Sequence, residues 1–183
     1  MEKLVIDTET TGLSPNINKI LTVGMLLVDV NKERLEILDS NHVFVKHEYY
    51  TINKEALKIN KIDIHEHHKI AEYPDKACDQ IDNFIEKNDL QKTPLLGHNL
   101  HFDKGFINAL FRQERRIPKL HAEHEDTLYI WRKLKQQQKI PEHVSGQLSD
   151  VANFLEIDTS NAHDALADCH ITAQVYHEIL KKF

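Results

Sequence analysis

Short apolar runs and longer helical patterns alternate along the chain. The run Leu4–Ile6 precedes a second apolar segment at 19–30, and the polar turn 31–34 leads to a third segment at 35–47. Runs of Ile, Leu and Val bounded by turn residues predict strands, so we expect these three segments to form a meander. Residues 93–99 predict a short buried strand, and an extended piece near 121–126 supplies a fifth.

Helical periodicity covers most of the remaining chain. In the segment 74–87, for example, Ala77, Ile81 and Phe84 share one helix face. Early strands, followed by strands that alternate with helices, predict a mixed α/β domain with helices packed on its sheet. A chain of 183 residues has room for one substantial core, so we expect a single domain over 1–183. Helical patterns occur in 51–87, 102–115, 127–138, 146–157 and 162–182.

The composition is that of an ordinary globular protein, with 40% hydrophobic and 28% charged residues. No segment approaches the roughly 18 apolar residues of a membrane span. The N-terminus reaches acidic residues before any apolar signal region develops, so we expect a cytoplasmic protein without membrane contact. Cys78 and Cys169 form no CxxC pair, and we expect free thiols in a reducing compartment.

Charge is distributed unevenly along the chain. The formal net charge is −6, which argues against a general positive coat for nucleic acid. Residues 104–139 are nevertheless rich in Lys and Arg. A solvated helix face and a local rim that attracts phosphate are both consistent with this basic run. Its members include Arg112, Arg115, Arg116, Lys119, Arg132, Lys133 and Lys135.

Asp7 and Glu9 follow the first apolar run with one residue between them, so both point to the same face of a strand. Two carboxylates at this distance repel each other, and burial adds to the cost. Asp103 follows the short buried strand, and Asp168 lies early in the last helix. An α/β sheet gathers such element ends into one cleft. A divalent cation would remove the repulsion, and carboxylate oxygens suit Mg²⁺ or Mn²⁺.

Four acids of this kind suit phosphodiester chemistry. Two ions about 3.5–4 Å apart are the standard arrangement for in-line attack on a phosphodiester. His163, five residues before Asp168, adds a side chain that accepts a proton near neutral pH. The five residues together therefore indicate metal-assisted hydrolysis of a phosphodiester.

These residues stand in three motifs that resemble those of the DEDD superfamily of 3′→5′ exonucleases, in its histidine-containing, DnaQ-like (DEDDh) branch. VIDTETTGL resembles the first motif, GHNLHFDKGFI the second and HDALADC the third, in order from residue 4 to about 176. The tyrosine-containing branch would read YxxxD in the third motif. The second motif reads HNxxFD, which is similar to the proofreading exonuclease subunit of bacterial DNA polymerase III and favours DNA over RNA.

The resemblance implies a ribonuclease H-like fold and two divalent cations, Mg²⁺ or Mn²⁺. It also implies release of nucleoside 5′-monophosphates from nucleic acid 3′ ends that are single-stranded or frayed. In this pattern Asp7, Glu9 and Asp168 hold the catalytic ion. Asp103 supports a second ion beside Asp7, and His163 is the general base. The positions that would hold the terminal nucleotide are the backbone at Thr10 and Thr11, the Leu13 side chain, and His98, Asn99 and Phe102.

Each of these residues also has a simpler explanation when taken alone. Asp7 and Glu9 could end a charged strand, and Asp103 could cap its helix. Asp168 could be a solvated helix residue, and His163 an ordinary polar histidine. The joint order of the three motifs argues against these explanations.

Other polar positions are better explained by structure than by chemistry. The HEHH segment at 65–68 lacks the HExxH spacing of a metal site, so we expect a solvated surface. Asp126 resembles a recurrent position of the family, but we expect it to cap a helix. Met25 and Trp131 are expected to pack in or near the core.

Two functional hypotheses follow. The first is an exonuclease, and its complete set of five residues supports catalysis. The second is an exonuclease-like adaptor subunit of a DNA polymerase with weak or no catalysis, for which a metal cluster would serve no purpose. The chain ends soon after its last predicted helix, so we expect a free-standing enzyme, with a polymerase partner as the alternative.

Overall fold

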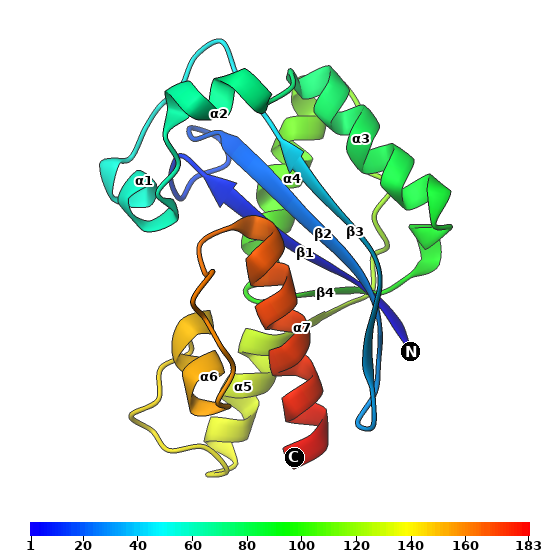
Figure 1. The fold of residues 1–183 in the computed structure, drawn as a ribbon, viewed down its shortest axis with the longest axis vertical. Coiled ribbons are helices and arrows are strands. Elements are labelled where there is room, and N and C mark those ends of the chain that lie inside the picture. The colour runs from blue at the N-terminus through cyan, green and yellow to red at the C-terminus, as the bar shows by residue number, and fades with distance from the viewer.

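A computed structural model describes residues 1–183, and a five-stranded sheet forms its centre (Figure 1). The strands are β1 Glu2–Thr10, β2 Ile20–Val30, β3 Leu35–Phe44, β4 Leu95–Gly97 and β5 His124–Asp126. They lie in the order β3-β2-β1-β4-β5, with β1, β2 and β3 antiparallel and with β4 and β5 parallel to β1. The predicted meander and the mixed five-stranded sheet are confirmed.

Seven α-helices and one 3₁₀-helix accompany the sheet. The predicted helical segment 51–87 contains three helices instead of one continuous pattern. Lys61 ends the first in the left-handed conformation, with φ 56°, and the Asp63 side chain caps the second. The helices are α1 Lys54–Asn60, α2 Ile64–Ile70, α3 Pro74–Lys87, η1 Leu90–Lys92, α4 Leu100–Gln113, α5 Thr127–Gln136, α6 Leu148–Phe154 and α7 Ala165–Lys182.

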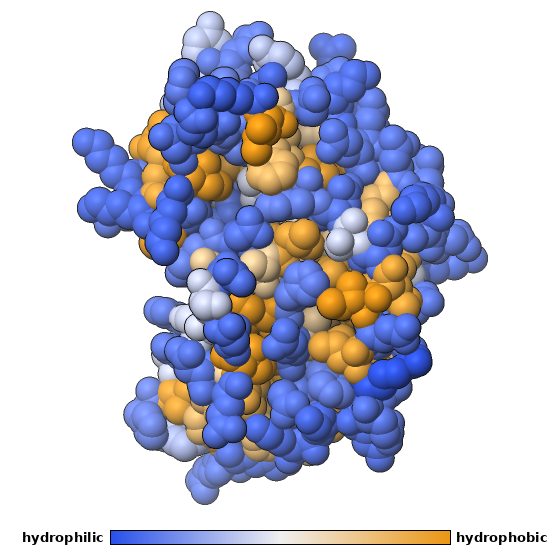
Figure 2. All heavy atoms as spheres, in the orientation of Figure 1, coloured by the Kyte–Doolittle hydropathy of each residue, from blue (hydrophilic) through white to orange (hydrophobic).

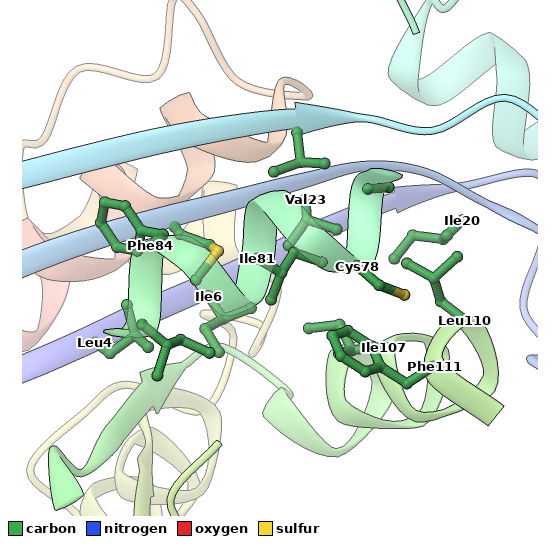
Figure 3. Close-up of a cluster of buried hydrophobic side chains, with 14 of the residues drawn as sticks. Leu4, Ile6, Ile20, Val23, Cys78, Ile81, Phe84, Ile107, Leu110 and Phe111 are labelled. Atoms are coloured by element: carbon green, nitrogen blue, oxygen red, sulfur yellow. The ribbon is translucent and has the colours of Figure 1, made fainter. Parts of the chain in front are cut away.

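One face of the sheet packs against α3 and α4. Leu4 and Ile6 of β1 point to this face and lie in a cluster of buried apolar side chains (Figure 3). Met25 belongs to the same cluster, as predicted. The helices contribute Ala77, Cys78, Ile81, Phe84, Ile85, Phe106, Ile107, Leu110 and Phe111.

The opposite face of β1 packs against α7. Val5 lies in a second apolar cluster with Cys169 and Tyr176 of that helix. Because side chains alternate along a strand, Asp7 and Glu9 point to the same face as Val5. The strand therefore directs both acids towards the side on which α7 lies.

A glycine allows α7 to approach the sheet closely. Gly24 of β2 pairs with Asp7 in the β1–β2 register. A Cβ atom at Gly24 would lie 2.3 Å from the carbonyl oxygen of Ala165, so no side chain fits between β2 and the start of α7. This contact brings the first turn of α7 next to the acidic end of β1.

A third cluster joins α5, α6 and α7. Trp131 of α5 is fully buried and packs edge-on against Phe154 of α6, with the ring centroids 5.5 Å apart. Val151 and Val175 lie in the same cluster. The predicted packing role of Trp131 is confirmed, and the cluster holds α5 beside the end of the sheet.

Two further expectations concern the cysteines and the membrane. Cys78 and Cys169 are both buried free thiols, as predicted. None of the helices combines the length and the apolar character that crossing a membrane requires.

We expect Gly24→Ala to destabilise the protein by about 1–3 kcal/mol, because the added methyl group must displace the backbone of α7. Gly105→Ala in α4 is the matched control, since its Cβ would meet only Pro15 Cγ at 3.5 Å. Replacing a glycine in a helix should stabilise by about 0.5–1 kcal/mol. Urea unfolding of both variants measures the two effects, and equal stabilities would contradict the close approach.

Candidate active site

Three carboxylates converge at the end of β1. Asp7 and Glu9 are both half-buried, and Asp168 reaches them from the first turn of α7. One carboxylate oxygen from each of these three residues lies within 4.8 Å of the other two. The structure therefore brings together three of the four acids selected from the sequence.

Asp103 lies beside this group but outside it. It is in the first turn of α4 and only 3% exposed, and its Oδ1 accepts a hydrogen bond of 2.7 Å from the Thr8 hydroxyl. Its charge is the largest Coulombic contribution that raises the pKa of Asp7. Asp103 is thus an electrostatic neighbour of Asp7, held by a hydroxyl that the sequence analysis did not select.

Burial raises the pKa of each of the four carboxyls, and repulsion by neighbouring carboxylates adds to the shift. For Glu9 burial is the larger cause and Asp168 the next, and together they raise its pKa to about 8. Burial raises the pKa of Asp103 to about 7, although the hydrogen bond from Thr8 opposes this shift. Burial likewise raises the pKa of Asp7 well above its usual range and also raises that of Asp168.

No lysine or arginine relieves this repulsion, because none of the four acids forms an ion pair with Lys or Arg. The donors are all carboxylate oxygens, which are the ligands that hard divalent cations prefer. Close, partly buried carboxylates without a positive partner fit a divalent cation.

His163 lies directly before the N-cap of α7. Its backbone has a φ of 74°, a left-handed conformation that few residues other than glycine adopt. Its N–H donates a hydrogen bond of 3.3 Å to Asp168 Oδ1, which ties this turn to the acidic group. His163 lines a recess of about 220 Å³ together with Asp7 and Asp168, so the predicted base and two predicted metal ligands share one space.

The last residue of β1 and the loop that follows it carry three of the predicted nucleotide contacts. The Thr10 hydroxyl donates to the carbonyl of Gly12, and the Thr11 N–H donates to the carbonyl of Lys19. Both threonines are buried and shape the loop, whereas Leu13 is 78% exposed. Leu13 is therefore the member of this group that is available to a ligand.

Apolar side chains gather on the surface near this loop. Figure 2 shows them over the α1 region at the upper left, and below it the outline is indented before the region of α5 and α6. Exposed apolar residues in this part of the chain are Leu13, Ile17, Ile52 and Ile59.

Asn60 lowers the pKa of Glu9, and it was not among the site residues selected from the sequence. It is buried at the end of α1, and its side-chain amide donates to the Thr10 carbonyl at 3.2 Å. A hydrogen bond from the same amide lowers the pKa of Glu9 and so opposes the effect of burial. No sequence signal pointed to Asn60, because α1 meets β1 only in the folded chain.

The other predicted nucleotide contacts lie around the start of α4. Both ring nitrogens of His98 are engaged, one with the Thr127 hydroxyl and one with the Gly146 carbonyl, each at 2.8 Å. Asn99 adopts a left-handed conformation with φ 65° and is exposed. The Phe102 ring is half-buried against Phe106, with the centroids 4.9 Å apart.

Asp126 caps α5, as predicted, and it also accepts hydrogen bonds from the start of α4. Its carboxylate accepts from the Leu128 N–H at the start of α5. The same carboxylate accepts from the N–H groups of Asn99 and Leu100 at the start of α4. One side chain therefore joins β5 and α5 to the helix that carries Asp103.

The HEHH segment differs in part from the predicted solvated surface. His65 and Glu66 are exposed, but His67 is only 5% exposed and its Nε2 lies 3.0 Å from the Val45 carbonyl. His68 is half-buried and contacts the Tyr50 hydroxyl. The prediction was wrong for these two histidines, because α2 packs them against the segment that follows β3.

Sequence and structure comparisons agree with this geometry. Residues 4–176 match a family model described as Exonuclease. Ribonuclease T of Wigglesworthia glossinidia brevipalpis is 26% identical over 98% of the chain and 85% of its own length. The PolC-type DNA polymerase III of Bacillus subtilis is 26% identical over 97% of the chain, which spans only 11% of that polymerase.

Solved structures show the same fold. E. coli Exonuclease I in complex with a dT13 oligonucleotide superposes with a TM-score of 0.80 at 21% identity, over 99% of this chain and 41% of its own. The nuclease domain of 3′hExo, a DEDDh family member bound to rAMP, gives a TM-score of 0.76 at 18% identity, over 98% and 92%. The predicted ribonuclease H-like fold is confirmed. With a family match over nearly its whole length and acids converging at the end of β1, this chain belongs to the exonuclease family of the DEDD superfamily and is a nuclease.

Proposed function

We propose that this nuclease is a divalent-metal-dependent 3′→5′ exonuclease that releases nucleoside 5′-monophosphates from single-stranded or frayed ends. The observation that carries the proposal is the convergence of Asp7, Glu9 and Asp168 within 4.8 Å, with His163 lining the adjoining recess. No lysine or arginine pairs with these acids, so their oxygens remain available to a divalent cation.

In this proposal Asp7, Glu9 and Asp168 hold one divalent cation, and Asp103 supports a second beside Asp7. When bound, the two cations supply Lewis-acid chemistry for the attacking water and for the leaving oxygen. The carboxylates are already in place, because β2, which pairs with β1 at Asp7, lies in contact with the start of α7 at Gly24. The left-handed turn at His163 places this residue in the wall of the recess that Asp7 and Asp168 also line.

His163 serves as the general base. It accepts a proton from the water whose oxygen attacks the last phosphodiester. The bond from phosphorus to the 3′-oxygen of the penultimate nucleotide then breaks, and that oxygen takes a proton from solvent. General-base catalysis of this kind contributes about 10²–10⁴-fold to the rate.

The terminal nucleotide lies on the Glu9 side of the acids. There the exposed Leu13 side chain offers an apolar contact for the base, and Phe102 offers a second from α4. Thr10, Thr11, His98 and Asn99 complete the proposed surroundings.

Both DNA and RNA are proposed substrates. The HNxxFD form of the second motif favours DNA, whereas similarity to ribonuclease T favours RNA. Similarity to a segment of a PolC-type polymerase is consistent with a polymerase partner. We favour a free-standing cytoplasmic enzyme of one domain, which would act without such a partner.

A paired digestion assay tests the proposal. Matched 5′-labelled DNA and RNA oligonucleotides are incubated with Mg²⁺, Mn²⁺ or EDTA. We expect a ladder that shortens from the 3′ end, is lost with EDTA, and is lost in Asp7→Ala, because Asp7 is central to the carboxylate group. Glu33→Ala removes an exposed acid of the β2–β3 turn and should retain wild-type activity. If folded, metal-supplied protein shortens neither substrate, an adaptor without catalysis is the better reading.

His163→Ala should reduce turnover by about 10²–10⁴-fold, because the attacking water loses its proton acceptor. Its Tm should still rise on addition of Mn²⁺, since the carboxylates are unchanged. His65→Ala is the matched control, because His65 is an exposed histidine in the HEHH segment. Steady-state rates and thermal melts of both variants make the comparison, and a nearly active His163→Ala protein would remove His163 from its proposed role.

Glu9→Gln should raise the Tm of the metal-free protein by several °C at pH 9. Folding raises the pKa of Glu9 from 4.5 to about 8, so the folded chain binds the extra proton and unfolding becomes easier as the pH rises through this window. The gap between variant and wild type should therefore narrow towards pH 5. Both proteins contain the same histidines, so any pH dependence that the histidines give to the Tm is shared and does not change the gap.

Thermal melts in EDTA between pH 5 and pH 9 measure this gap. Adding Mg²⁺ at pH 9 should raise the Tm of the wild type more than that of Glu9→Gln. A gap that does not change with pH would show that Glu9 is not a destabilising charge in the folded protein.

A further inference from the structure

A second recess adjoins the catalytic one. It lies between α5 and residues 145–148 and has a volume of about 610 Å³. His98, Gln147 and Leu148 line both recesses, so the two spaces share a wall and are adjacent along the surface. Any chain that leaves the catalytic recess past His98 enters this second recess.

Arg132 is the uncompensated cation of the second recess. It is exposed and lines the recess, and its guanidinium forms no ion pair or hydrogen bond with the rest of the chain. Its charge acts on His98 in the shared wall. Burial is the largest cause that lowers the pKa of His98, and the positive charge of Arg132 lowers it further. Lys135 has a structural task, since its Nζ donates to the carbonyls of Glu142 and Val144 at 2.7 Å each.

Two other members of the basic run, Arg116 and Lys119, are already paired with acids. Arg116 contacts the carboxylates of Asp79 and Asp82, and Lys119 contacts that of Glu86. These cations join the segment after α4 to α3 and are partly neutralised there. Neither the solvated helix face nor the phosphate-attracting rim that the sequence suggested describes these two cations, which pair with acids of α3.

The arrangement of the acids indicates what occupies the second recess. This step rests on the proposed function, in which the terminal nucleotide lies on the Glu9 side, next to Leu13. The remaining strand must then leave on the other side of the scissile bond. Asp7 and Asp168 line the catalytic recess on that side, and the second recess continues it past His98.

We propose that the recess between α5 and residues 145–148 binds the nucleic-acid strand on the 5′ side of the scissile bond, with Arg132 contacting a backbone phosphate. A protein with a net charge of −6 needs such a local cation, because its acidic site and its overall charge repel the strand. A guanidinium suits this task, since its planar N–H groups match phosphate oxygens. The contact reads no base and acts on DNA and RNA alike.

Two substrates that differ only on the 5′ side of the scissile bond test this proposal. The p-nitrophenyl ester of thymidine 5′-monophosphate has one nucleotide and no strand, whereas a single-stranded thymidine dodecamer has both. For Arg132→Ala we expect the ratio of kcat/KM for dodecamer over ester to fall about tenfold, the effect of one charge-assisted hydrogen bond. The change should lie mainly in KM, and Arg132→Lys should recover part of it.

Lys139→Ala is the matched control. It removes one exposed positive charge just after α5 from a residue that lines neither recess. Its ratio should equal that of the wild type. An unchanged ratio in Arg132→Ala, or an equal loss in Lys139→Ala, would overturn the proposal.

A binding measurement separates this inference from the proposed function. If the wild type cleaves neither substrate, the proposed function has failed, and binding of a 5′-fluorescent dodecamer is measured in Ca²⁺. Arg132→Ala should then bind about tenfold more weakly. Its plot of log affinity against log salt should be shallower by about 0.7, the value for one phosphate contact with a single strand. Equal affinity and equal slope would overturn the role of Arg132.

Discussion

Repulsion among the carboxylates at the end of β1 is the constraint on which the rest of the structure depends. Burial raises the pKa of Asp7, Glu9 and Asp168, and their oxygens still lie within 4.8 Å of one another. Apolar packing holds the supporting elements together against this repulsion. β1 is anchored in clusters on both of its faces, and α7 lies against β2 at Gly24. Stability elsewhere in the fold thus offsets an unfavourable arrangement at the site.

Apolar packing positions the helices and strands that carry the acids, and hydrogen bonds then position the side chains themselves. Thr8 holds the Asp103 carboxylate, and Asn60 acts on Glu9 from α1. Asp126 binds the N–H groups at the start of α4, while His98 connects that turn to α5 and to the loop before α6. Elements that are distant in the sequence therefore meet through short polar contacts, and these contacts pre-organise the site for a charged ligand.

The two sides of the site differ in chemistry. The Glu9 side carries the exposed apolar Leu13, and the Asp7 side leads to polar walls and to Arg132. A nucleic-acid end has the same polarity, because an unstacked base offers an apolar face and the backbone carries the charge. This difference gives the site a direction that four acids alone would lack. In the proposed function, Arg132 would supply the local cation through which an acidic protein acts on a polyanion.

Local patterns in the sequence determined the strands, the later helices and the identity of the acidic residues. Alternation and helical periodicity report which side chains are buried, and they placed Asp7 and Glu9 on one face of β1. Tertiary structure decided the division of 51–87 into three helices, the burial of His67, and the place of Asp103 outside the three-acid group. It also decided that Arg116 is paired and Arg132 is not. Distances and partners of this kind depend on contacts between residues far apart in the chain, and no local periodicity encodes them.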